Sequence, residues 1–259
     1  MPLITLTSDF GWRDHYIASL KGALYTVVPD ATIVDISHEV ISHNNIDASF
    51  IFKNSYHLFP PQSIHFVAVD LAGMDKLRLL YTYHEQMHFI LPDNGIISLI
   101  FQSLPQNIIQ IDTFGFPLFI TYKEVFAGIA SKIANNEAIE GPMLSDIKRF
   151  MPMNTMLYTD MIKGTVVYVD NFDNAITNIH ITDFEKVQQD RNFEISFGRN
   201  RFMNLAESYA SVPEGEKLCL FNSMGLLEIA INKGNAASLL NLKQGSQVMI
   251  QFMQKPNKA

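Results

Sequence analysis

The sequence predicts an α/β protein in two parts: an N-terminal, mostly parallel α/β sandwich domain and a smaller C-terminal all-β, barrel-like domain. Up to about residue 145, apolar β-like runs alternate with segments of helical period, as in a parallel sheet covered on both faces. From residue 164 onward, short strands are separated by turn clusters instead of long helices. The chain has 259 residues, 47% of them apolar, which is enough for two hydrophobic cores.

The N-terminal elements follow one another as strand and helix. Residues 2–9 alternate apolar and polar side chains and lead into Gly11, as expected of a strand that ends in a loop. Apolar positions then recur at intervals of three and four from Tyr16 to Leu24, and Pro29 ends that helix. The same patterns predict further strands at 32–37, 64–70 and 87–92, and further helices at 46–59 and 96–104.

The C-terminal part is expected to be antiparallel. Its predicted strands are bounded by turn residues and lie at 165–170, 192–197, 217–222, 226–231 and 246–252. Between the two parts, residues 145–162 contain prolines and methionines without a clear period. We therefore predict an N-terminal domain over 1–150, a linker over 151–163 and a C-terminal domain over 164–259.

Composition argues against several classes of function. The formal net charge of -7 offers no basic surplus for phosphates, so nucleic-acid binding is disfavoured. The apolar runs are far shorter than the roughly 20 residues that cross a bilayer, and the first residues do not resemble a signal peptide. We therefore expect a cytoplasmic protein without membrane contact. Cys219 is the only cysteine, so no cluster of thiolates is available to bind zinc or iron–sulfur, and we expect no metal.

Carboxylates gather where the predicted parallel strands end. Asp9 follows the first strand, Asp35 lies within the second and Asp70 ends the third. In an open parallel sheet, ligands bind at the carboxyl ends of the strands. For each aspartate alone, capping of a loop is an equally good explanation, because aspartate favours turns. The three together favour a binding site.

Two C-terminal segments carry groups suited to a purine. Residues 170–178, DNFDNAITN, offer two carboxylates, several amides and one aromatic ring. Amides can hydrogen-bond the edge of a base while a ring stacks on its face. An Asx-rich hairpin turn explains the same residues, and physical grounds alone favour that turn. Residues 222–228, NSMGLLE, and 235–237, NAA, have the composition of a tight turn and a helix start.

Taken in order, these segments resemble the S-adenosylmethionine hydroxide adenosyltransferases, relatives of the 5′-fluorinase and 5′-chlorinase. Each motif alone is weak, but their order and spacing are specific, and they run nearly from end to end. They include T-S-D-F-G at 7–11, V-D-I-S-H at 34–38, P-D-N-G at 92–95, D-N-F-D-N-A-I-T-N-I at 170–179 and N-S-M-G-L-L-E-I-A at 222–230. The fold of that family, an α/β domain followed by a small β barrel, agrees with the two predicted domains.

The resemblance implies a homotrimer that binds S-adenosylmethionine between the N-terminal domain of one subunit and the C-terminal domain of the next. By position, Asp9 would hold the ribose hydroxyls. The methionine amino group would be held by Asp14, Asp170 and Ser223. Adenine would be contacted by Phe172, Asn174 and the backbone near Asn235, Ala236 and Ala237.

The resemblance also implies a reaction without metal or cofactor, in which water attacks C5′ of S-adenosylmethionine to give adenosine and L-methionine. Family members support the water with an Asp, an Arg and a His. Here Asp70 matches the Asp of the V-D-P-G-V-G-x-x-R pattern, and Arg78 comes one residue late. Thr121 stands at the His of the T-F-H-G-R-D pattern, and threonine cannot titrate as a base near neutral pH. The expected catalytic residues are therefore Asp70 and Arg78.

Several functions remain open on this basis. A hydrolase with an altered site is the leading hypothesis. A catalytically weakened or inactive protein that binds S-adenosylmethionine or adenosine is the alternative, and a trimeric scaffold without a ligand is a third. Halogenation is disfavoured, because the halogenating relatives have an uncharged residue where this chain has Asp70, and a carboxylate repels an anion.

Overall fold

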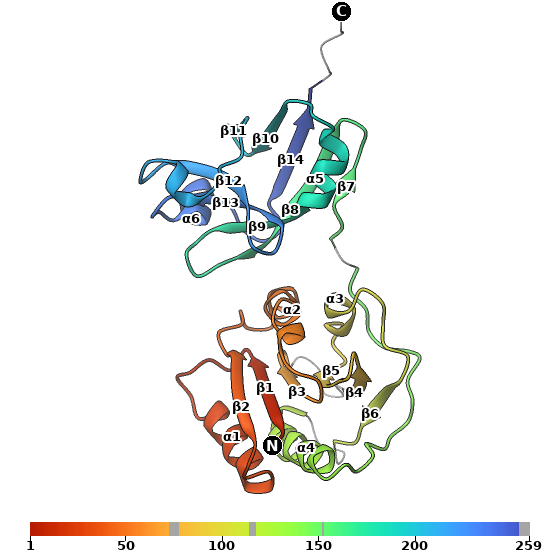
Figure 1. Cartoon of the computed structure of the whole chain (residues 1–259). Helices are drawn as coiled ribbons and strands as arrows, with labels where there is room; N and C mark the ends of the chain where they lie inside the picture. Colours follow the sequence, from red (N-terminus) through yellow and green to blue (C-terminus); the bar gives the residue numbers. More distant parts are fainter. Residues whose placement is uncertain (73–77, 114–117, 152, 254–259) are drawn as a thin grey trace, which may run out of the picture. The chain divides into compact units, whose positions relative to one another are not determined.

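The computed structural model of the chain describes residues 1–72, 78–113, 118–151 and 153–253. It divides into two compact units, Met1–Pro152 and Met153–Ala259 (Figure 1). Within the described residues, no helix combines the length and the apolar character needed to cross a lipid bilayer.

The N-terminal unit is built on a six-stranded sheet in the order β2-β1-β3-β5-β4-β6. Its strands are β1 Leu3–Ser8, β2 Thr32–Ser37, β3 Ile64–Ala68, β4 Leu79–His84, β5 Met87–Pro92 and β6 Ile108–Ile111. Strands β1, β2, β3 and β5 run parallel, and β4 is antiparallel to both of its neighbours. The predicted mostly parallel sheet is confirmed.

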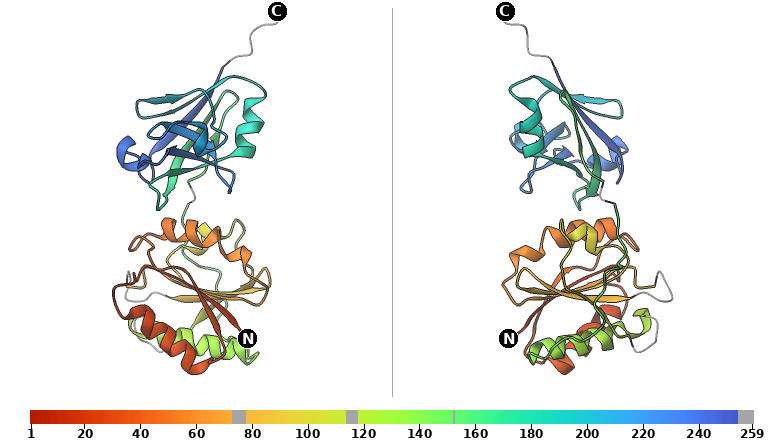
Figure 2. Two further views of the ribbon diagram at one scale, coloured as in Figure 1. Left: turned by 60° about the vertical axis from the view of Figure 1, so that its left-hand side comes forward. Right: turned by 90° about the vertical axis from the view of Figure 1, so that its right-hand side faces the viewer.

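Helices cover both faces of this sheet (Figure 1, Figure 2). One face carries α1 Tyr16–Val27 and α4 Leu118–Ala134, and the other carries α2 Asn45–Lys53, η1 Tyr56–Leu58 and α3 Ile97–Ile100. Because neighbouring side chains of a strand point to opposite faces, β3 contributes to two cores. Phe66 stacks on Phe126 of α4 with 4.6 Å between ring centroids, while Val67 belongs to the cluster that contains Phe52 of α2.

Several elements differ from the predicted N-terminal pattern: β4, β6 and α4 were not predicted, and the helix predicted over 96–104 ends at Ile100. The helix predicted over 46–59 ends at Lys53, because the side chains of Asn54 and Ser55 donate back to carbonyls of the preceding turn. Strand β4 was not predicted. It pairs with β5 through a two-residue turn, in which Glu85 and Gln86 adopt φ of 48° and 62° without the Asn-Gly signal usual for such turns.

The C-terminal unit is a barrel-like antiparallel sheet of eight strands. The strands are β7 Met156–Leu157, β8 Met161–Val169, β9 Ala175–His180, β10 Phe193–Phe197, β11 Asn200–Phe202, β12 Lys217–Phe221, β13 Leu226–Ile231 and β14 Gln247–Phe252. Three short helices, α5 Ile181–Gln188, η2 Tyr209–Ser211 and α6 Ala236–Leu240, accompany them. The predicted small β domain is confirmed. Part of the segment 151–163, expected to be a linker, is strand, since Leu157 of β7 pairs with Ile162 of β8.

His65 on β3 lies in the core of the N-terminal unit. Its Nδ1 is 2.7 Å from Thr5 Oγ1, and its ring stacks on Phe89. Burial, with a smaller contribution from the charge of His88, lowers the pKa of His65 to about 4. The folded unit therefore keeps this imidazole neutral, whereas the unfolded chain takes up a proton below a pH of about 6.5. Its contribution to stability is full above that pH and is lost as the pH falls toward 4.

We predict that this titration lowers the free energy of unfolding of the N-terminal unit by up to about 1.4 kcal/mol per pH unit between pH 6.5 and 4.5. Urea unfolding followed by the fluorescence of Trp12, the single tryptophan, measures it. The variant His65→Gln cannot titrate and is expected to show a shallower dependence on pH. Equal slopes for the two proteins would mean that His65 titrates alike in the folded and unfolded chains.

Candidate functional site

The carboxylate of Asp9 joins the loops that follow three parallel strands. Asp9 comes directly after β1, and its Oδ2 accepts the backbone N–H of His43 at 3.0 Å and that of Asp70 at 3.1 Å. His43 belongs to the loop after β2, and Asp70 comes two residues after β3. Three segments far apart in the sequence therefore meet at one oxygen atom, at the sheet edge where α/β proteins bind ligands.

Both residues that donate to Asp9 have unusual backbones. His43 has φ of 61° and Asp70 has φ of 54°, a left-handed conformation that is unfavourable for most residues other than glycine and asparagine. Such conformations persist where surrounding interactions hold them. Here they place the two side chains in contact, with 2.8 Å between His43 Nδ1 and Asp70 Oδ1. The Asp70 side chain is 23% exposed and that of His43 is 65% exposed.

The flanking motifs hold these two loops. Asn44 caps α2 by accepting the N–H groups of Ile46 and Asp47, which fixes the residue next to His43. Asn94, in the P-D-N-G motif, donates to the carbonyl of Val69 at 3.0 Å and so holds the residue next to Asp70. Neighbouring structure thus fixes both members of the histidine–carboxylate pair.

A pocket of about 390 Å³ opens beside the pair. The residues that line it are Asp9, Phe10, Tyr16, Ser42, His43, Leu71, Ala72, Phe119 and Tyr122. Aromatic rings supply its apolar wall, since Phe10 lies 5.1 Å from Tyr122 between ring centroids. Burial, followed by the charges of Tyr16 and Glu124, raises the pKa of Tyr122, so its phenol is neutral. The pocket therefore combines aromatic surface with one carboxylate and one imidazole.

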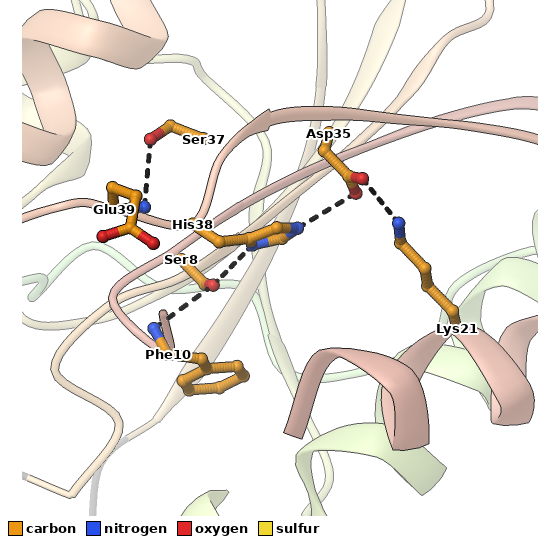
Figure 3. A network of polar contacts seen from close by, with 7 residues as sticks. All are labelled: Ser8, Phe10, Lys21, Asp35, Ser37, His38 and Glu39. Atoms are coloured by element: carbon orange, nitrogen blue, oxygen red, sulfur yellow. Dashed lines mark hydrogen bonds and ion pairs between the residues drawn. The ribbon is translucent and has the colours of Figure 1, made fainter. Parts of the chain in front are cut away.

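A partly buried chain of polar groups fixes the loop that carries Asp9 (Figure 3). Ser8 Oγ lies 2.7 Å from His38 Nδ1, His38 Nε2 lies 2.9 Å from Asp35 Oδ1, and Lys21 donates to Asp35 Oδ2. The His38 carbonyl accepts the N–H of Gly11 at 2.8 Å, which ties the far end of the loop to the same residue. Asp35, one of the three aspartates noted at strand ends, therefore has a structural role in this network.

The protonation states in this chain follow from its geometry. Burial lowers the pKa of His38, and Asp35 offsets that effect only in part, so the imidazole is neutral. Burial alone would raise the pKa of Asp35, but hydrogen bonds from Lys21 and His38 outweigh burial and lower it. The ionised carboxylate can only accept, so His38 carries its proton on Nε2 and accepts from the Ser8 hydroxyl at Nδ1. Each group in the chain is thereby satisfied.

Arg78, predicted to be catalytic, is paired with two aspartates of the N-terminal unit. Its Nε donates to Asp93 Oδ2 at 2.8 Å, and its guanidinium also contacts Asp146. Asp93 is almost completely buried, and a buried carboxylate requires a cation or several donors. No ion pair between Arg78 and Asp70 is found in the described ranges, and part of the family pattern between them, residues 73–77, lies outside those ranges. The structure therefore does not bring Arg78 to Asp70.

Thr121 lies on α4, partly buried, in a helix whose Phe119 and Tyr122 line the pocket. The residue whose side chain contacts the Asp70 carboxylate is His43, which was not predicted from the sequence as a site residue. Its position in the loop after β2, at the same sheet edge as Asp9 and Asp70, was the one signal available. Asp14, in the loop before α1, is exposed to solvent.

In the C-terminal unit, residues 170–174 form a tight loop between β8 and β9. Asp170 Oδ1 accepts the N–H groups of Phe172 and Asn174 at 2.9 and 2.8 Å, and its Oδ2 accepts from the Asn174 amide. The Asx-turn interpretation is therefore correct for Asp170. The same turn leaves the Phe172 ring 76% exposed. Asp173 holds the start of α6, because its carbonyl accepts the N–H of Ala237 at 2.7 Å.

A second pocket, of about 570 Å³, lies over this loop. The residues that line it are Asn171, Phe172, Asp173, Asn174, Tyr209, Ile231, Asn232, Lys233, Gly234 and Asn235. Phe172, Asn174 and Asn235 are among the residues predicted to contact a purine. Ala236 and Ala237, which were predicted with them, are buried at the start of α6.

A buried carboxylate connects this loop to the N-S-M-G turn. Glu228 accepts from Tyr209 at Oε1 and from Asn222 Nδ2 at Oε2, and Asn174 Nδ2 lies 3.5 Å from the Tyr209 hydroxyl. Burial, followed by Glu228, raises the pKa of Tyr209, which therefore stays a donor. Asn222 also accepts the N–H of Met224 and so shapes the turn on which Ser223 is exposed. The structure thus joins the two C-terminal motifs in one network.

Comparison with known proteins agrees with both halves of this description. Residues 4–142 match the SAM hydroxide adenosyltransferase N-terminal domain, and residues 164–249 match the C-terminal domain of the same name, where SAM is S-adenosylmethionine. An (R)-S-adenosyl-L-methionine hydrolase from Methanocaldococcus jannaschii is 27% identical over 96% of both chains. A fluorinase from Nocardia brasiliensis is 25% identical over 96% of both chains. The crystal structure of an uncharacterised conserved protein from Thermotoga maritima superposes with a TM-score of 0.84 at 27% identity, covering 96% of this chain and 99% of that one.

Proposed function

This chain belongs to the SAM hydroxide adenosyltransferase family, and we propose that it hydrolyses S-adenosylmethionine to adenosine and L-methionine. The observation that carries the proposal is the meeting of Asp9, His43 and Asp70 beside a pocket at the carboxyl end of the parallel sheet. Relatives along nearly the whole chain are named for this hydrolysis.

We assign the ribose to Asp9. One oxygen of its carboxylate is engaged by two backbone N–H groups, and an ionised carboxylate has acceptor capacity on both oxygens. Its Oδ1 is suited to accept hydrogen bonds from the 2′ and 3′ hydroxyls of a nucleoside. Charge-assisted hydrogen bonds of this kind are stronger than those between neutral groups.

We assign the adenine to the pocket of the C-terminal unit. The exposed ring of Phe172 can stack on a purine, and the amide of Asn174 with the backbone near Asn235 can bind its edge. The methionine amino group is assigned to Asp14, Asp170 and Ser223, because an ammonium is favoured near carboxylates.

We further propose that the two half-sites meet in a homotrimer, with the N-terminal unit of one subunit facing the C-terminal unit of the next. Each pocket alone offers only part of the groups that the substrate requires. Apolar side chains on each side of the boundary between the units are exposed, with Met151 95% and Met156 58% exposed. Exposed apolar side chains of this kind can be buried in an assembly. We also propose a cytoplasmic location, with which the buried and free Cys219 agrees.

The chemistry requires little beyond a well-placed water. The sulfonium of the substrate is already a good leaving group, so no cofactor is needed to activate it. The protein must hold the water in line with the C5′–S bond and partly desolvate it. The carboxylate of Asp70 can accept a hydrogen bond from that water and favour its hydroxide character. The same negative charge disfavours a halide nucleophile, which separates this chain from its fluorinase relatives.

We predict that the purified chain converts S-adenosylmethionine to adenosine and that Asp70→Asn lowers kcat by about 100-fold with little change in KM. Asparagine tolerates the left-handed backbone at position 70, so the fold is expected to persist. Chromatography of adenosine and methionine measures the product, and Asp30→Asn, at an exposed turn, is the matched control. A halide-dependent product would contradict hydrolysis. Binding of adenosine without turnover would support the non-catalytic alternative.

A mixing experiment tests whether subunits share the site. Asp70→Asn inactivates the N-terminal half-site, and Phe172→Ala with Asn174→Ala inactivates the C-terminal half-site. If each site uses two subunits, co-expression of the two variants in equal amounts restores about one quarter of the wild-type activity, because half of each kind of half-site is intact. A mixture no more active than its components would contradict a shared site.

A further inference from the structure

The hydrolysis proposed above needs an acceptor for the proton that the water loses. Thr121, at the position where the family pattern has histidine, cannot accept it near neutral pH. Arg78 is engaged with Asp93 and is a cation that carries donors only. Among the residues that the structure describes, the titratable side chain that contacts Asp70 is His43, at 2.8 Å.

The contact with Asp70 defines how His43 is protonated. An ionised carboxylate has no proton to donate, so Nδ1 of the neutral imidazole must carry the hydrogen that lies between them. Nε2 then has a free lone pair. The His43 side chain is 65% exposed and lines the same pocket as Asp9, so substrate and water have access to it.

We propose that His43 and Asp70 form a carboxylate–imidazole dyad in which His43 Nε2 accepts the proton of the attacking water. This assignment rests on the proposed hydrolysis. The water oxygen forms a bond to C5′, the C5′–S bond breaks, and its electron pair stays on the sulfur of methionine. The proton passes to Nε2 and then to solvent, which restores the neutral imidazole.

The charges around His43 suit this role. The Asp70 carboxylate contacts its ring, and the Asp9 carboxylate accepts its backbone N–H. The other titratable groups that line the pocket are the phenols of Tyr16 on α1 and Tyr122 on α4. One carboxylate therefore contacts the imidazolium that forms in the reaction and a second is bound to the backbone of the same residue, and nearby negative charge stabilises the imidazolium. The hydrogen bond from its backbone N–H to Asp9 holds His43 in place while its ring changes charge.

The test compares variants that fit the left-handed backbone at position 43. His43→Asn keeps an amide that can donate to Asp70 but cannot accept a proton, and His43→Gly leaves space for a small molecule. We expect His43→Asn to lower kcat by about 100-fold with KM within about threefold, and to flatten the acid limb of the pH–rate profile. Added imidazole is expected to restore activity to His43→Gly. His57→Asn, at an exposed histidine on η1, is the control and should retain wild-type kcat.

The outcomes separate this proposal from the one on which it rests. If the wild type forms adenosine and His43→Asn does so at the same rate, the role of His43 is wrong and hydrolysis stands. If His43→Asn is slow but keeps the wild-type pH profile, and imidazole does not rescue His43→Gly, then His43 is structural and the dyad is wrong. If the wild type forms no adenosine, both proposals fail.

Discussion

One carboxylate oxygen organises the candidate site of the N-terminal unit. Oδ2 of Asp9 accepts N–H groups from His43 and Asp70, which lie on loops that follow two different strands and both have left-handed backbones. Each such conformation costs about 1 to 3 kcal/mol, so it requires compensating interactions. Hydrogen bonds to a charged acceptor provide them. Without Asp9, we expect the loops after β2 and β3 to relax and the contact between His43 and Asp70 to be lost.

The network behind Asp9 makes this arrangement rigid. Ser8, the preceding residue, donates into the buried chain through His38 and Asp35 to Lys21 of α1. That chain binds the loop after β1 to the loop after β2 and to a helix that covers the sheet. A satisfied polar chain whose inner members, Ser8 and His38, are buried favours a single arrangement, because a displacement there leaves a buried polar group unpaired. The T-S-D-F-G and V-D-I-S-H motifs are thus joined by hydrogen bonds in one network.

The sequence identified the sheet edge but could not resolve its details. The location of Asp9 and Asp70 at this edge was predictable, because the carboxyl ends of parallel strands meet at one edge of the sheet for any conformation of the loops. His43 was not, since its contact depends on a left-handed backbone that no residue pattern signals. Arg78 was predicted to be catalytic from its spacing to Asp70 along the chain. In the structure, its guanidinium pairs with the buried carboxylate of Asp93. At residues 170–174, an Asx turn is present and its residues also line a pocket, so the turn and the proposed binding surface do not exclude each other.

The most direct measurement is a crystal structure of the chain with adenosine bound. We expect the ribose hydroxyls within hydrogen-bonding distance of Asp9 Oδ1, while Oδ2 keeps the N–H groups of His43 and Asp70, and C5′ to face the dyad. A ribose bound away from Asp9, or an Asp9 that releases the two N–H groups when the nucleoside binds, would contradict the central role assigned to this carboxylate.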